Sequence, residues 1–303
     1  MRSLSNSYLE RAGEETRLVR AFFDEATFTV TYLVGDPATQ QAVVIDPVLD
    51  FDPASGRLST RSADAVLMAA REGRWNIGLV LETHAHADHL TAAPYIKAAT
   101  GAKIGIGAQV TEVQAVFAKV FGADDIKTDG SDFDLLLQDG EKIPLGEQEI
   151  VVMHTPGHTQ ACVSYRIGDA VFVGDTLFMP DYGTARADFP GGDARALYRS
   201  IRLILDLPGA TRVFLCHDYL APGRDKYAWE TTVAEERARN VHVHDGIDED
   251  TFVAMRTERD RGLAAPRLLL PSVQVNIRAG HLPPAEPNGT HYLKIPLRLP
   301  VPA

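Results

Sequence analysis

The sequence predicts an α/β (α+β) fold in which two mixed β-sheets pack against each other, with helices on the outside. Short apolar and β-branched runs dominate the first two-thirds of the chain, and stretches with helical periodicity are interleaved with them. Four of the strand-like runs end in His or Asp. Because ligand-binding residues of α/β proteins collect at the carboxyl ends of strands, we expect a functional site along one edge of the sheets.

In the first half of the chain, strands and helices are expected to alternate. The expected strands are 27–34, 42–45, 77–81 and 103–106, and the expected helices are 62–72, 92–100 and 111–121. Thr111 and Gln114 predict a capping box at the start of the last of these helices, and Gly122 predicts its end.

The second half is expected to continue this pattern as far as residue 240. The expected strands are 149–153, 161–167, 170–173 and 213–216. Asp193 is a good N-cap for a helix whose apolar residues recur at i, i+4, i+7 and i+8 from Leu197, which places them on one helical face.

Beyond residue 240 the alternation of strands and site residues stops. One amphipathic helix is predicted over 248–261, and the end of the chain is rich in proline. We therefore expect one main domain over 1–240 and a C-terminal extension over 241–303 that packs on that domain.

Composition restricts the compartment and the partners. The net charge of −11 argues against nonspecific binding to nucleic acid or to an acidic membrane surface. Two cysteines, Cys162 and Cys216, are too few for a disulfide scaffold and fit a reducing compartment. No apolar run approaches the ~20 residues of a membrane span, and residues 1–20 lack the apolar stretch of a signal peptide. We expect a cytoplasmic protein, and the sequence leaves a homo-oligomer open.

A cluster of metal-ligand residues follows the strand expected at 77–81. His84, His86, Asp88 and His89 place three imidazoles and a carboxylate within six consecutive positions. Imidazole and carboxylate together suit zinc, iron or manganese better than calcium or magnesium. Three more candidate ligands follow later strands, namely His158, Asp175 and His217. The other histidines, His154, His242, His244, His281 and His291, are expected to be surface or hydrogen-bonded residues.

The pattern His-x-His-x-Asp-His, followed by a distant Gly-His, an Asp and a further His, resembles the metallo-β-lactamase fold superfamily over about residues 20–240. The resemblance implies an αββα sandwich, with 1–240 as its catalytic domain. It also implies a dinuclear arrangement as one option. In that option one metal is held by His84, His86 and His158, the second by Asp88, His89 and His217, and Asp175 bridges the two.

Other segments resemble the persulfide dioxygenases (sulfur dioxygenases) of this superfamily. These segments include 156–159, 185–189, 217–219 and the tail segment 273–280. The resemblance implies one Fe(II) per chain, held by His84, His158 and Asp175. Two histidines and one carboxylate form a facial triad that leaves coordination positions open. The implied substrates are glutathione persulfide and O₂, and the implied products are sulfite and glutathione.

The same resemblance implies roles for the remaining candidates. His86, Asp88, His89 and His217 would be catalytic groups that hydrogen-bond metal-bound water and orient the triad. Arg186, Tyr219 and Arg237 would bind glutathione, because arginine suits carboxylates through bidentate hydrogen bonds. For Arg237, pairing with acidic neighbours on a surface helix is an equal alternative.

Two other functions remain open at this point. A di-zinc hydrolase resembling glyoxalase II would cleave a glutathione thioester with a metal-bound hydroxide and would use the same ligand positions. A metal-binding sensor without catalytic activity is a more distant alternative.

Overall fold

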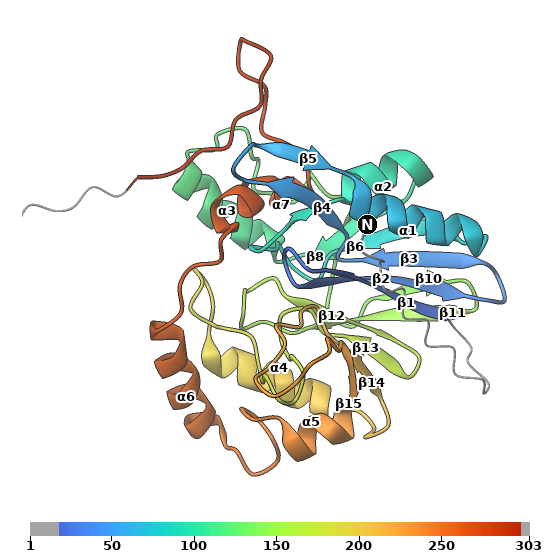
Figure 1. Cartoon of the computed structure of the whole chain (residues 1–303), viewed down its shortest axis with the longest axis vertical. Coiled ribbons are helices and arrows are strands. Elements are labelled where there is room, and N and C mark those ends of the chain that lie inside the picture. Colours follow the sequence, from blue (N-terminus) through green and yellow to red (C-terminus); the bar gives the residue numbers. More distant parts are fainter. Residues whose placement is uncertain (1–17, 298–303) are drawn as a thin grey trace, which may run out of the picture.

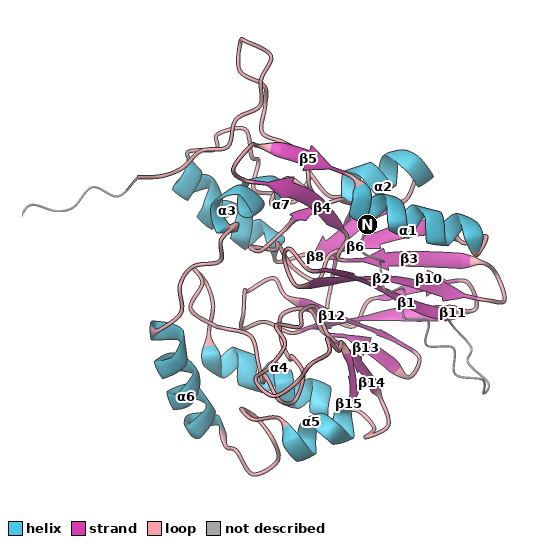
Figure 2. Cartoon of the chain, in the orientation of Figure 1, coloured by secondary structure: helices cyan, strands magenta, loops and turns pink. Residues whose placement is uncertain are grey.

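The computed structural model describes residues 18–297, which form a four-layered sandwich with two six-stranded sheets at its centre (Figures 1 and 2). The first sheet has the order β1-β2-β3-β6-β8-β9. Its strands are β1 (Leu18–Asp24), β2 (Thr29–Asp36), β3 (Gln41–Ile45), β6 (Asn76–Leu81), β8 (Lys103–Gly107) and β9 (Leu135–Leu137). The pairs β1–β2 and β2–β3 are antiparallel and the others are parallel, so the sheet is mixed.

The second sheet runs in chain order from β10 to β15. Its strands are β10 (Lys142–Leu145), β11 (Gln148–His154), β12 (Val163–Ile167), β13 (Ala170–Phe172), β14 (Arg212–Phe214) and β15 (Glu230–Thr232). Only β13 and β14 pair in parallel, so this sheet is also mixed. A small third sheet contains β4 (Val48–Asp52), β5 (Arg57–Ser59) and β7 (Leu90–Thr91).

Helices cover the outer faces of both sheets (Figure 1). The first sheet is covered by α1 (Arg61–Glu72), α2 (Ala93–Thr100), α3 (Val110–Phe121) and α7 (Leu269–Asn276). The second is covered by α4 (Ala194–Leu205), α5 (Val233–Arg239) and α6 (Glu249–Arg261). This arrangement confirms the predicted fold class of two mixed sheets with helices outside.

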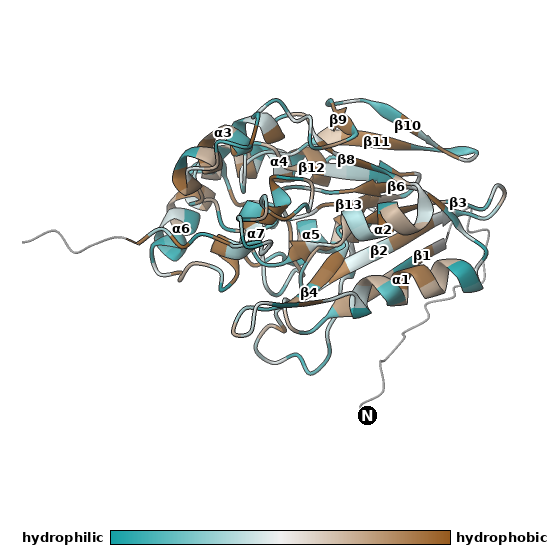
Figure 3. Ribbon diagram, turned by 90° about the horizontal axis from the view of Figure 1, so that it is seen from above, coloured by the Kyte–Doolittle hydropathy of each residue, from teal (hydrophilic) through white to brown (hydrophobic). Residues whose placement is uncertain are grey.

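Three apolar clusters fill the three spaces between these four layers. Their buried members include Val44, Val66 and Ile96 between the first sheet and its helices, Tyr32, Ile45 and Tyr165 between the sheets, and Ile201, Val213 and Phe252 between the second sheet and its helices. In Figure 3 the strand β6 is strongly hydrophobic, whereas α1 shows both hydrophobic and hydrophilic residues. Strands that are covered on both faces need continuous apolar runs, while a helix with one face in water is amphipathic.

Three predicted helix starts are confirmed to within one residue, but the capping box predicted for one of them is wrong. The Asp193 side chain accepts hydrogen bonds from the first turn of α4, and Asp248 caps α6 in the same way. The α3 helix has no side-chain cap, however. The Gln114 amide instead donates to the carbonyl of Ile277, 163 residues away, so its partner could not be found from local sequence.

The extension beyond residue 240 contacts both halves of the sandwich. Arg195 of α4 forms ion pairs with Glu249 and Asp250 at the start of α6. Helix α7 lies against β7 and α3. Within residues 18–297, no helix combines the length and apolar character that a membrane span requires. The expectation of no N-terminal signal rests mainly on residues 1–17, which lie outside the described part of the chain.

Candidate metal centre

The first four candidate ligands lie on the loop that joins β6 to β7. The loop begins where β6 ends at Leu81 and continues to Leu90, the first residue of β7. It contains His84, His86, Asp88 and His89. All three histidines are buried. An unpaired buried imidazole is costly, so each ring nitrogen of this loop needs a partner.

The other three candidates come from loops of the second sheet. His158 follows β11, Asp175 follows β13 and His217 follows β14. Glycines precede two of them, and both have positive φ: Gly157 at 142° and Gly174 at 52°. A Cβ atom on Gly157 would lie 2.3 Å from the Leu197 backbone, so only glycine lets the chain turn this close to α4.

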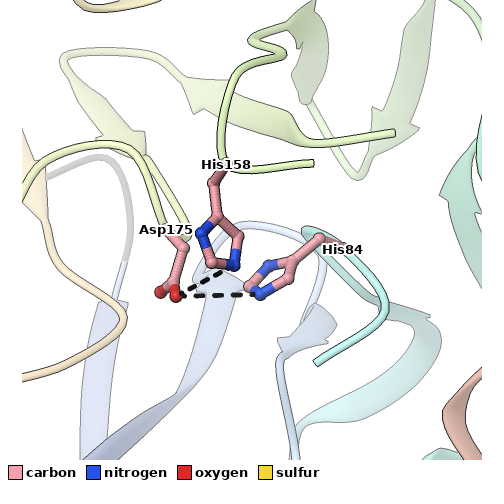
Figure 4. A group of neighbouring side chains, drawn as sticks. All are labelled: His84, His158 and Asp175. Carbon is pink, nitrogen blue, oxygen red and sulfur yellow. Dashed lines mark ion pairs between the residues drawn. The ribbon is translucent and has the colours of Figure 1, made fainter. Parts of the chain in front are cut away.

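His84, His158 and Asp175 converge on one point (Figure 4). Asp175 Oδ2 lies 3.5 Å from His158 Nε2 and 3.9 Å from His84 Nε2. The three potential ligand atoms all lie within 4.8 Å of one another. Ligand atoms bonded to a single transition-metal ion at about 2.0–2.2 Å are separated by such distances.

Hydrogen bonds on the far side of each ring orient these two histidines. His158 Nδ1 lies 2.9 Å from the carbonyl oxygen of Arg186 and must donate to it. His84 Nδ1 lies 3.0 Å from Thr83 Oγ1, whose own proton goes to Asp46 Oδ2. Both rings therefore carry the proton on Nδ1 and present the lone pair of Nε2 to the centre, as metal-ligating histidines do.

His217 is held in the same way on the opposite side of Asp175. Its Nδ1 lies 3.1 Å from the Phe28 carbonyl, and its Nε2 lies 3.2 Å from Asp175 Oδ1 and 3.6 Å from Asp88 Oδ2. Burial lowers the pKa of His217, but the carboxylates of Asp175 and Asp88 outweigh it and raise the pKa to about 9. A cation bound here would displace that proton, because metal and proton compete for the same lone pair.

His86 lies next to the triad but is anchored to carboxylates beneath it. Its Nε2 lies 2.9 Å from Asp46 Oδ1 and 3.3 Å from Glu82 Oε2. His86 belongs to two other sets of mutually close ligand atoms, one with Asp88 and His89 and one with Asp46 and Glu82.

Several buried nitrogen atoms around the centre lack a hydrogen-bond partner. They are His84 Nε2, His86 Nδ1, His89 Nε2 and His217 Nε2, the last of which faces Asp175 Oδ1 without a well-formed hydrogen bond. Burial, together with the charge of nearby His86, holds the pKa of His84 well below its ordinary value, so this ring is neutral as a ligand must be. The chemistry of these atoms fits a bound transition metal, and their number allows a second ion beside the triad.

A cavity of about 460 Å³ opens above the candidate ligands. Asp88, His158 and Asp175 form part of its lining, and its volume lies within the range of small-molecule sites. Of the three predicted substrate-binding residues, Arg186 and Tyr219 also line this cavity. The Arg186 guanidinium is already bound by Asp188 at 2.6 Å and donates to the carbonyl of Ala264.

Arg237 is not brought to the cavity. Its guanidinium lies on α5 and pairs with Asp245 at 3.0 Å, and the residue is absent from the cavity lining. The structure instead favours the alternative of a surface residue paired with an acidic neighbour, although the partner is Asp245 rather than a residue on its own helix.

Residues of the extension line the cavity without having been predicted to do so. They are His242, Arg256, Arg259 and Arg267, together with neighbours between Leu263 and Leu268. His242 accepts a hydrogen bond from Thr184 N, as expected for a hydrogen-bonded histidine. Burial, followed by the charges of Arg259 and Arg256, lowers the pKa of His242 to about 4, so its ring stays neutral. No local motif marked the three arginines, because Arg256 and Arg259 look like ordinary polar residues of the helix predicted over 248–261 and Arg267 lies in the segment after it.

Comparisons with known proteins agree with this geometry. Residues 25–217 match the family described as the metallo-beta-lactamase superfamily. A probable metallo-hydrolase of Burkholderia pseudomallei is 54% identical over 92% of this chain and 98% of its own. Glyoxylase B2 of Dictyostelium discoideum is 46% identical over 92% of this chain and 96% of its own, and the human mitochondrial persulfide dioxygenase ETHE1 is 30% identical over 87% and 89%.

A solved structure shows the same fold over most of the chain. ETHE1 from Myxococcus xanthus superposes with a TM-score of 0.69 and 33% identity, covering 87% of this chain and all of its own. The resemblance drawn from the sequence is thus confirmed, and the His and Asp residues of a superfamily metal site are present. This chain belongs to the metallo-β-lactamase superfamily of metal-binding enzymes.

Proposed function

We propose that this protein is a persulfide dioxygenase that oxidises glutathione persulfide with O₂ and uses one Fe(II) per chain. The observation that carries the proposal is the convergence of His84 Nε2, His158 Nε2 and Asp175 Oδ2 within 4.8 Å of one another. Ferrous iron on two histidines and one carboxylate supplies open coordination positions for O₂ and a sulfur ligand. The reaction balances as GSSH + O₂ + H₂O → GSH + sulfite + 2 H⁺, in which the terminal sulfur is oxidised and O₂ is reduced.

The residues around the triad would hold the substrate and exclude water. Asp88 and His217 lie beside Asp175, where they can accept or donate a proton to a group above the triad. Phe178 and Tyr219 form an aromatic part of the cavity wall, with ring centroids 5.7 Å apart. Such a wall shields a reactive sulfur from bulk water.

Arg259 and Arg267 are our candidates for binding the two carboxylates of glutathione. Both line the cavity, and neither forms an ion pair among the contacts of the described residues. Arg186 is less free to bind substrate because its Nε and Nη2 already donate to Asp188 and its Nη1 donates to the carbonyl of Ala264. In a chain with a net charge of −11, two unpaired arginines at the mouth of a cavity provide a local attraction for an anionic substrate.

Thioester hydrolysis at two metal ions is the second candidate, and the comparisons taken alone favour it. The relatives named metallo-hydrolase and glyoxylase are 54% and 46% identical, whereas the human persulfide dioxygenase is 30% identical. The unpartnered nitrogens of His86, His89 and His217 are a structural observation in its favour. We rank it second because His84, His158 and Asp175 form a complete set of mutually close ligand atoms by themselves, whereas His86 belongs only to other sets.

Parallel activity assays separate the two reactions. The protein is loaded with iron anaerobically and given glutathione persulfide, while O₂ uptake and sulfite are measured. A second sample is loaded with zinc and given S-lactoylglutathione. We expect O₂ uptake and sulfite release in equal amounts from the first sample. Hydrolysis of the thioester without any O₂ uptake would reverse the ranking, and turnover in neither assay would favour a sensor.

A further inference from the structure

The tail segment 273–280 lies next to the metal-binding loop, although it follows the family match at residues 25–217 by more than fifty positions. Asn276, the last residue of α7, is buried against the loop between β6 and β7. Neither the fold nor the proposed reaction accounts for a buried amide at this place.

The Asn276 side chain makes three hydrogen bonds to the backbone, two to that loop and one to Thr91 in β7, where the loop ends. Its Nδ2 donates to the carbonyl oxygens of His86 at 2.8 Å and His89 at 2.7 Å. Its Oδ1 accepts from the Thr91 N–H at 2.9 Å. The partners fix which end of the amide is oxygen, because carbonyls need a donor and an N–H needs an acceptor.

The two bonds to His86 and His89 satisfy backbone carbonyls that lie outside any sheet or helix. The loop between Leu81 and Leu90 has no regular secondary structure, so its buried carbonyls depend on side chains. The bonds to His86 and His89 also bracket Asp88, so one amide holds the backbone of three candidate ligands or catalytic groups.

The segment that carries Asn276 is itself firmly attached. Gln114 of α3 donates to the Ile277 carbonyl at 2.8 Å. The Arg278 guanidinium donates two hydrogen bonds of 2.8 Å to the carboxylate of Asp125. Ile277 and Arg278, the two residues after Asn276, are therefore held by hydrogen bonds to other parts of the fold. Asn276 in turn holds the metal-binding loop through its own hydrogen bonds.

We propose that Asn276 is a positioning residue that sets the geometry of the metal-binding loop and thereby the metal affinity. The proposal rests on the metal site of the proposed function, but it does not depend on which reaction occurs there. It applies whether His86 and His89 are ligands or hydrogen-bonding neighbours of the triad, since groups that orient metal ligands strongly affect metal affinity.

The test compares two amide side chains on the same helix. In Asn276→Asp, a carboxylate would face two carbonyl oxygens, and Asn276→Ala removes the same bonds without adding charge. Gln274 is the matched control: its amide also makes three backbone bonds, to Leu270 O at 2.7 Å, Lys294 O at 2.9 Å and Lys294 N at 2.8 Å. None of these three bonds reaches the metal loop.

Zn²⁺ affinity is measured for the full-length chain by competition with a chromophoric chelator, and the visible spectrum of the Co²⁺-loaded protein is recorded. We expect both Asn276 variants to bind Zn²⁺ about 10–100-fold more weakly and to show an altered Co²⁺ spectrum. The changes Gln274→Glu and Gln274→Ala should lower thermal stability but leave affinity and spectrum unchanged.

The outcomes separate this inference from the proposed function. Wild-type affinity and spectrum in folded Asn276→Ala would refute the positioning role and leave Asn276 a structural tether. If that variant does not fold, the milder Asn276→Ser is measured in the same way and decides by the same criterion. A wild-type chain that binds neither Zn²⁺ nor Fe²⁺ would overturn the metal site itself.

Discussion

The floor and the wall of the cavity are built on different principles. The floor consists of strand-end loops that carry His84, His158 and Asp175, all buried and each oriented by further contacts. One side of the wall comes from the chain after α5 and presents exposed arginines such as Arg259 and Arg267. The comparison suggests that the floor sets the metal chemistry and the wall sets which substrate binds.

The largest effect is expected from the floor. Asp175→Ala should abolish binding of metal at the triad, because a site with two histidines and one carboxylate has no spare ligand. Metal content after dialysis against metal-free buffer measures this. Asp225→Ala, at an exposed carboxylate, is the control and should retain the wild-type content. Full metal content in Asp175→Ala would show that the floor is assigned wrongly.

A buried carboxyl on α5, the helix before the wall segment, should make stability depend on pH. Burial raises the pKa of Glu236 to about 8 from an ordinary value of 4.5, and Asn240 donates to it at 2.7 Å. Because the folded-state pKa is the higher one, its contribution to stability is complete below pH 4.5 and is lost as the pH rises through 8.

Glu236→Gln should remove that loss, which amounts to about 2–3 kcal/mol between pH 6 and pH 9. Urea unfolding at pH 6 and pH 9 compares the variant with wild type. An equal loss of stability in both proteins over that interval would show that Glu236 is not protonated in the folded state. Metal content at pH 7 should be unaffected.

Arginines of the wall should affect substrate affinity rather than metal binding. Removing either Arg259 or Arg267 by alanine substitution is expected to raise KM for a glutathione substrate by about 10-fold with little change in kcat, because a charge-assisted hydrogen bond to a carboxylate is lost. Arg237→Ala is the control, since that side chain pairs with Asp245 away from the cavity. A larger KM effect in Arg237→Ala than in the other two would restore the assignment made from sequence.

The smallest effect is expected at the N-cap of α4, because this residue stabilises a helix and does not touch the metal site. Asp193 accepts hydrogen bonds from Arg195 N and Ala196 N at the start of α4. Asp193→Ala should destabilise folding by about 1 kcal/mol and leave metal content and KM unchanged. Thermal unfolding of the metal-free protein measures the loss, and a change in metal content would mean that α4 influences the floor.

The metal ligands of the floor could be predicted from sequence because each one is close in the chain to the strand that positions it. Each candidate ligand lies in a loop that follows an apolar strand, so the strand pattern and the residue type together mark it. The structure brings all seven candidates together. The same holds for helices with a side-chain cap, such as α4 and α6.

The wall, and the residues that hold the metal-binding loop in place, could not be predicted because their contacts join residues that are far apart in the sequence. Helix α7 has no side-chain cap and is buried on several sides, so it shows no amphipathic period. Gln114 and Asn276 look like ordinary polar residues until partners 163 and 190 positions away are known. Arg237 and Arg259 both lie on polar helical faces, and only the packing of α6 over the cavity distinguishes them.

Metal identity and stoichiometry of freshly purified protein test the central claim most directly. If His84, His158 and Asp175 hold a single ferrous ion, elemental analysis should find close to one iron per chain and little zinc. Close to two zinc ions per chain, with iron absent, would contradict this account and indicate that His86, His89 and His217 serve as ligands as well.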